Sequence, residues 1–159
     1  MDNIIIRELK ANEWEEAMQL AWQTFMKFEA SDYAPEGVKS FRDFVKGENL
    51  KELFLKGDYP AWGAFDNGIC IGVISMRNKS HISLLFVDGD YHHRGIASEL
   101  INTLFDHAEN IFGQREVTVN SAPYARGFYH KIGFVDLDGE KTVDGIRYTP
   151  MVIDLKERS

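Results

Sequence analysis

A glycine-containing turn between an apolar strand and a helix is the first segment that could do chemistry. It reads His92-His93-Arg94-Gly95-Ile96-Ala97, and it follows a strand expected at 81–87. A helix N-terminus offers unpaired backbone N–H groups and the positive end of the helix dipole, which together bind phosphate. Gly95 would let the backbone approach such a ligand closely. The pattern is neither a P-loop nor the dinucleotide-binding glycine motif, and a plain tight turn into a helix is the alternative.

A second segment follows the next expected strand and combines polar and aromatic side chains. Asn120 ends a strand expected at 115–120, and Tyr129 lies on a short helix expected at 122–132, which Gly133 closes. Taken alone, such aromatic side chains are more typical of a protein core than of a catalytic site.

Metal and thiol chemistry are less well supported. His92 and His93 stand near two aspartates, but adjacent histidines diverge, and no spacing typical of metal ligands is present. Cys70 lies between two isoleucines in an expected strand, where a cysteine is usually a small buried hydrophobe. We therefore expect no metal.

The hydrophobic pattern predicts an α/β domain around these segments. Asn67-Gly68 predicts a hairpin, and Asn12 with Glu15 predicts a capping box at the first helix. The helix after the glycine turn is a crossover, which requires parallel strands, so the sheet must be mixed. Strands are expected at 3–9, 61–65, 69–77, 81–87, 115–120, 134–137 and 147–155, and helices at 12–29, 35–47, 96–112 and 122–132.

Length and composition exclude several classes of protein. The 159 residues correspond to about one domain, expected to span 1–159. A hydrophobic fraction of 44% excludes a disordered chain, and the net charge of −7 argues against a nucleic-acid partner. The apolar runs are too short for a membrane helix or a signal peptide, and one cysteine excludes a disulfide-built fold. We expect a cytoplasmic protein with no membrane partner, and a homodimer stays open.

Together the two segments resemble the GNAT superfamily of acyl-CoA-dependent N-acetyltransferases. The family pattern Gln/Arg-x-x-Gly-x-Gly/Ala reads here as 92–97, with His92 as a departure at the first position. The resemblance covers nearly the whole chain. It implies an acyltransferase that uses acetyl-CoA, with a mixed sheet of about seven strands flanked by about four helices. The later family pattern Asn…Ala…Phe-Tyr…Gly-Phe matches Asn120, Ala125, Phe128, Tyr129, Gly133 and Phe134.

The resemblance also implies roles for individual residues. Backbone groups at the end of the strand would bind the pantetheine amides, and backbone N–H groups of the turn would hold the pyrophosphate. Tyr129 and Asn120 would lie beside the thioester as the catalytic residues, with Tyr129 protonating the departing thiolate. The residues expected to bind the cofactor are Phe86, Val87, His92, Arg94, Gly95, Ile96, Ala97, Ser98, Asn120 and Phe128.

The acceptor side is less defined. In GNAT folds the region after the first helix borders the acceptor, so Glu29, Asp32 and Tyr33 are candidate substrate-binding residues, and the two carboxylates could attract a cationic amine. A solvated helix end is the alternative. A backbone N–H on the strand before the turn could stabilise the oxyanion. The general base stays open among a water chain, His81 and Glu29.

Two functions follow from these observations. The first is N-acetyl transfer from acetyl-CoA to a primary amine of a small molecule or peptide. The alternative is an acyl-CoA-binding regulatory or inactive homologue that acts as a protein-interaction module. The presence of Tyr129 favours the enzyme.

Overall fold

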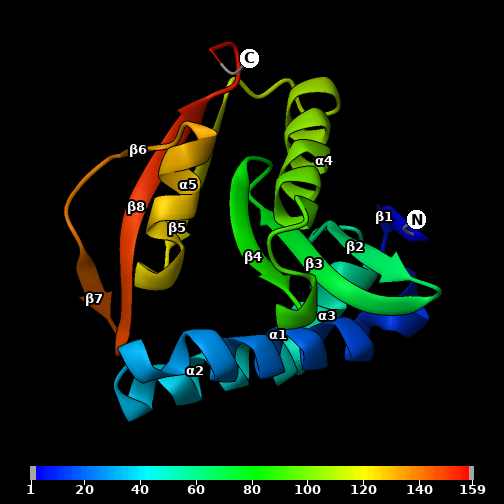
Figure 1. The fold of residues 1–159 in the computed structure, drawn as a ribbon, viewed down its shortest axis with the longest axis horizontal. Coiled ribbons are helices and arrows are strands. Elements are labelled where there is room, and N and C mark those ends of the chain that lie inside the picture. Colours follow the sequence, from blue (N-terminus) through cyan, green and yellow to red (C-terminus); the bar gives the residue numbers. More distant parts are fainter. Residues whose placement is uncertain (1–2, 158–159) are drawn as a thin grey trace.

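A mixed sheet of eight strands organises the protein (Figure 1), as seen in a computed structural model that describes residues 3–157. Every neighbouring pair of strands is antiparallel except β4 and β5, which are parallel. The predicted mixed α/β architecture is therefore confirmed. The order across the sheet is β1 (Ile4–Glu8), β2 (Ala61–Asp66), β3 (Ile69–Arg77), β4 (His81–Val87), β5 (Glu116–Ser121), β8 (Ile146–Asp154) and β6 (Val135–Asp136), and β7 (Lys141–Val143) pairs with β8.

Helices cover both faces of this sheet. Helices α1 (Trp14–Phe28), α2 (Pro35–Lys46) and α3 (Glu48–Leu55) pack on one face, and α4 (Ile96–Asn110) and α5 (Arg126–Ile132) pack on the other. The prediction missed α3 and β7, which are short. No helix within residues 3–157 has both the length and the apolar character needed to cross a bilayer.

The start of α1 differs from the prediction. Asn12 is not its N-cap, because residues 11–13 form a 3₁₀ turn and the helix begins at Trp14. The Glu13 carboxylate accepts a hydrogen bond from the Lys10 backbone N–H at 2.7 Å and pairs with Arg7 at 2.7 Å. The capping acid therefore lies two residues earlier than Glu15, where an arginine of β1 can reach it.

A bulge in β4 decides which side chains face which layer. The register between β3 and β4 shifts between Ser75 and Met76, so that one residue of β4 has no direct partner. Ile82 consequently packs with α4, whereas Leu84 and Phe86 pack with α1 and α2. Without that extra residue the strict alternation of a strand would keep all three on one face.

Strands β4 and β5 separate soon after they begin. They pair only at His81–Thr118 and Ile82–Val119, after which β4 is held by β3 and β5 by β8. In Figure 1 they diverge toward the end of the molecule that α1 and α2 cross. The Asp88 N–H bonds to the Ile71 carbonyl of β3, so the alternation of an antiparallel ladder turns the backbone groups of Leu85 and Val87 toward the opening.

Two glycines join the β7–β8 hairpin to α2. Gly145 takes a left-handed conformation (φ 79°) in the hairpin turn. A Cβ built on Gly37 would lie 2.2 Å from the Gly145 carbonyl oxygen, and one built on Gly145 would lie 2.5 Å from the Gly37 nitrogen. The backbones therefore touch, and no larger residue fits at either position.

We predict that Gly145→Ala destabilises the protein by about 1–3 kcal/mol, because it combines backbone strain with a steric clash. Gly139→Ala is the matched control, since a Cβ there meets nothing within 4 Å, and it should change the free energy of unfolding by less than about 0.5 kcal/mol. Urea denaturation of both variants measures the difference. Equal stability would show that the Gly37–Gly145 contact does not hold the hairpin.

Candidate functional site

Two cavities open where β4 and β5 separate. The first, of about 450 Å³, lies between α1 and α2 on one side and β4, β5 and β8 on the other. The second, of about 360 Å³, lies between the end of α1, the end of β4, the start of α4 and the start of α5. The cavities meet, because both are lined by Glu29, Leu85, Phe86, Ala125 and Tyr129.

The second cavity contains most of the residues predicted to bind the cofactor. Gly95 is the N-cap of α4, with φ 79°, and a Cβ built there would meet nothing within 4 Å. Glycine is therefore required by backbone conformation, and the space before the helix N-terminus is open to an anionic group. The predicted residues that line this cavity are Phe86, Val87, His92, Gly95, Ile96, Ala97, Ser98 and Phe128.

Two predicted cofactor residues lie elsewhere. The Arg94 side chain stacks on the ring of Tyr91, 5.0 Å from its centroid, and does not line the cavity. Only its backbone remains available for the predicted role. Asn120 lines the first cavity and not the second, because it belongs to β5, which has already diverged from β4.

His92, the departure from the family pattern, has a structural role. Its Nε2 donates a hydrogen bond to the Val87 carbonyl at 2.7 Å. Its ring packs on Phe28 at 4.8 Å, and Phe28 stacks on Tyr124 at 5.5 Å. The histidine thus binds the turn to the end of β4, and Phe28 links α1 to the segment before α5.

One wall of the first cavity is aromatic. Phe25 stacks on Phe41 at 4.1 Å and on Tyr33 at 5.3 Å, and Phe41 contacts Phe86 at 5.6 Å. Phe44 extends this wall with 38% of its surface exposed. Helical periodicity in α2 turns Phe41 and Phe44 toward the sheet. They line a cavity there, because the sheet opposite them has opened.

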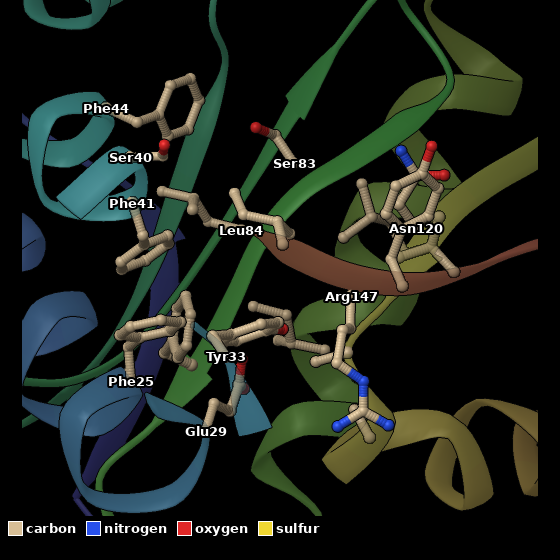
Figure 2. A pocket seen from close by; sticks show the side chains of 18 of the residues that line it. Phe25, Glu29, Tyr33, Ser40, Phe41, Phe44, Ser83, Leu84, Asn120 and Arg147 are labelled. Atoms are coloured by element: carbon tan, nitrogen blue, oxygen red, sulfur yellow. The ribbon is translucent and has the colours of Figure 1, made fainter. Parts of the chain in front are cut away.

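The opposite wall is polar. Arg147 of β8 and Asn120 of β5 face Phe25, Phe41 and Phe44 across the cavity (Figure 2). Arg147 donates from Nε and Nη2 to Glu140 at 3.2 and 3.3 Å and from Nη1 to the Asp32 carbonyl at 3.1 Å. The side chain of Asp32, a candidate substrate-binding residue, does not line the cavity. Its backbone holds the arginine in place.

Glu29 and Tyr129 face the junction of the two cavities from opposite sides. Burial, and secondarily the Asp32 charge, raise the pKa of Glu29 to about 7. Burial, and secondarily the Glu29 charge, raise the pKa of Tyr129 well above its usual value. Neither side chain makes a hydrogen bond within residues 3–157, and no fully buried polar side-chain atom in that range lacks a partner. Both polar groups must therefore be open to the cavities.

His81, the other side chain considered as a general base, already contacts two polar side chains. Its Nδ1 lies 2.7 Å from Thr118 Oγ1 and its Nε2 lies 3.3 Å from the Arg77 guanidinium. Arginine can only donate, so Nε2 is the acceptor and Nδ1 carries the proton. Burial and the Arg77 charge lower the pKa of His81 to about 4. Among the described residues no three potential metal-ligand side chains lie close enough to hold an ion.

Comparison with known proteins shows which family this chain resembles. Residues 29–155 match the model of the acetyltransferase (GNAT) domain. The chain is 28% identical over 134 residues to the uncharacterized N-acetyltransferase YafP of Escherichia coli (strain K12), covering 84% of this chain and 83% of the relative.

Solved structures share the fold over almost the whole chain. A GCN5-related N-acetyltransferase from Rhodopseudomonas palustris superposes with a TM-score of 0.82 at 22% identity, covering 97% of each chain. The PaiA N-acetyltransferase from Thermoplasma acidophilum, solved in complex with coenzyme A, superposes with a TM-score of 0.77 at 21% identity, covering 96% of this chain and 99% of that one. The chain therefore belongs to the GNAT acetyltransferase family, as its two motifs predicted, and is an acyltransferase that uses acetyl-CoA.

Proposed function

We propose that the protein acetylates a primary amine of a small molecule, with Glu29 as the general base and Tyr129 as the general acid. The observation that carries this proposal is the junction of the two cavities, where both side chains are open to the same space. A cofactor thioester entering from the second cavity and an amine entering from the first would meet there. The sequence prediction left the base open, and these contacts favour Glu29.

Glu29 is better placed than His81 to take the proton of the amine. An alkyl amine of pKa about 10 is nearly all ammonium at neutral pH and must lose a proton before it attacks. With its pKa at about 7, Glu29 can accept that proton at a cost of about 4 kcal/mol. His81 has its free lone pair occupied by Arg77 and lies where β4 and β5 are still paired.

Tyr129 then supplies a proton on the other side. Acetyl-CoA provides the thioester: the N–C bond forms, the C–S bond breaks, and CoA leaves as a thiolate. Tyr129 protonates this thiolate and is restored by the second proton that the nitrogen gives up, so that one proton per turnover leaves through Glu29. The raised pKa of Tyr129 keeps the phenol protonated until the thiolate forms.

Backbone groups of β4 complete the site. The N–H groups of Leu85 and Val87 point into the opening and have no neighbouring strand there. One of them is suited to stabilise the oxyanion that develops on the thioester, because a fixed backbone donor needs no reorganisation during the reaction. A binding module without activity would not need an unpartnered phenol and an unpartnered carboxylate on opposite sides of this space.

We predict that CoA stabilises the protein through the turn before α4. At a concentration 100-fold above its dissociation constant, it should raise the free energy of unfolding by about 2.7 kcal/mol. Gly95→Glu should abolish this effect, because it places an anion where the pyrophosphate binds. Gly113→Glu is the matched control, since Gly113 also has a positive φ (64°) and open space around it. A full CoA-induced thermal shift in Gly95→Glu would exclude this binding mode.

We predict that Glu29→Gln lowers kcat on the order of 10²-fold or more. In the unmodified protein kcat/KM should rise with pH through about 7, as the carboxylate forms, and this acidic limb should disappear in the variant. Asp32→Asn is the control at the same helix end. It removes a charge that raises the pKa of Glu29, so the limb should move to lower pH while the maximal rate is kept. If the acidic limb of the kcat/KM profile is unchanged in Glu29→Gln, then another group is the general base.

The thermal stability of Glu29→Gln provides a second measurement. Burial raises the pKa of Glu29 from 4.5 to about 7, so the folded state binds the proton more tightly than the unfolded state. The stabilising contribution is therefore present below pH about 4.5 and is lost as pH rises through about 7. Glu29→Gln should accordingly melt at a higher temperature than the unmodified protein at pH 8 while losing activity, which distinguishes lost catalysis from misfolding.

We predict that Tyr129→Phe lowers kcat by on the order of 10²-fold or more and leaves the CoA-induced thermal shift nearly intact. The substitution removes only the oxygen, and that oxygen has no hydrogen-bond partner within residues 3–157 to lose. Steady-state kinetics with a saturating amine provide the measurement. Tyr59→Phe is the control, because Tyr59 is a buried tyrosine whose hydroxyl bonds to Ser75 and Ser83. It should lower stability but not kcat. An unchanged kcat in Tyr129→Phe would return this residue to a packing role.

A further inference from the structure

We infer that the acceptor is an α-amino acid with a large apolar or aromatic side chain, bound with its ammonium at Glu29, its carboxylate at Arg147 and its side chain against the aromatic wall of the first cavity. This inference rests on the proposed function, because it names the acceptor of the same site. The aromatic wall consists of Phe25, Phe41 and Phe44.

The wall fits an apolar body. Phe25 is almost fully buried and stacks on Phe41 at 4.1 Å, so it fixes the position of Phe41 before any ligand arrives. Phe44 keeps 38% of its surface exposed at the cavity, which costs free energy in water. Covering such side chains with an apolar ligand group contributes about 25 cal/mol per Å² of apolar surface removed from water.

The charges of the cavity fit a zwitterion better than a polycation. Its lining has two carboxylates, Glu29 and Asp144, and two guanidinium groups, Arg77 and Arg147. A polyamine would bring several ammonium groups close to these two guanidinium groups, which repel them. A ligand with one ammonium and one carboxylate can place the first near Glu29 and the second near Arg147.

Arg147 has hydrogen-bond donors left for the carboxylate of a ligand. A guanidinium has five N–H donors, and three of them are used in the bonds to Glu140 and to the Asp32 carbonyl. These bonds fix the plane of the group, and two donors remain for a ligand. Arginine is suited to carboxylates because its planar fork can offer two parallel hydrogen bonds.

Glu29 and Arg147 both lie near Tyr33. Burial raises the pKa of Tyr33, the charges of Glu29 and Asp32 add to that rise, and the charge of Arg147 opposes it. An α-amino acid carries its ammonium and carboxylate on a single carbon, with the side chain as the third substituent. Glu29, Arg147 and the aromatic wall therefore provide one contact surface for each substituent.

The experiment compares three acceptors that share one benzyl group with spermidine, which has none. CoA release from acetyl-CoA is measured with L-phenylalanine, L-phenylalaninamide, 2-phenylethylamine and spermidine. We expect kcat/KM for phenylalanine to exceed each of the other three by at least 10-fold. The amide is the decisive control, because it keeps the α-amine and the ring and lacks only the carboxylate charge. An equal or higher value for the amide, phenylethylamine or spermidine, or no reaction with phenylalanine, would overturn the inference.

Two variants separate the parts of the proposed contact. Arg147→Gln should raise KM for phenylalanine at least 10-fold and leave KM for phenylethylamine unchanged, with Arg42→Gln, an exposed arginine of α2 outside the cavity, as control. Phe44→Ala should raise KM for phenylalanine and not for alanine, with Leu53→Ala as control. An equal effect of Arg147→Gln on both amines would show that Arg147 does not bind the carboxylate.

The two proposals fail separately. If another amine is preferred while Glu29→Gln and Tyr129→Phe still remove activity toward it, the acceptor class is wrong and the catalytic roles stand. If those variants keep full activity toward phenylalanine, the catalytic roles are wrong and the acceptor class stands.

Discussion

The early separation of β4 and β5 is the constraint on which the rest of the site depends. The two strands share only two residue pairs, because β4 stays with β3 and β5 stays with β8. The backbone groups of Leu85 and the N–H of Val87 are left at the opening without a neighbouring strand, whereas the Val87 carbonyl accepts a hydrogen bond from His92. Unpaired backbone groups away from water are costly, so this edge favours a ligand that can itself donate and accept, as the two amides of a pantetheine arm do.

The same opening brings together two side chains that are distant in the sequence. Glu29 comes from the end of α1 and Tyr129 from α5, on opposite faces of the sheet, and they meet only because the sheet between them is absent. Each is desolvated at this position, which raises the pKa of both groups. Ionising the buried Glu29 carboxylate at neutral pH therefore costs stability.

The two cavities are built in different ways. The second cavity takes most of its lining from the stretch between the end of β4 and the start of α4, which His92 supports, and α1 and the start of α5 complete it. The first cavity is assembled from α1, α2, β4, β5 and the β7–β8 hairpin. Its geometry therefore depends on packing between separate elements, including the contact of Gly37 with Gly145.

The sequence alone determined the features that depend on neighbouring residues. Apolar runs and the Asn67-Gly68 turn predicted the β2–β4 meander, and the glycine turn predicted the start of α4, because side-chain periodicity and positive φ are local properties. That locality explains why nearly all of the predicted cofactor residues line one cavity. Tertiary structure alone decided the first cavity. Helical periodicity indicated that Phe41 and Phe44 face the sheet, but not that the sheet has opened before them. Helical periodicity does not predict that Arg147 contacts the Asp32 carbonyl or that Glu29 lies near Tyr129. Both depend on long-range packing of α1, α5 and β8.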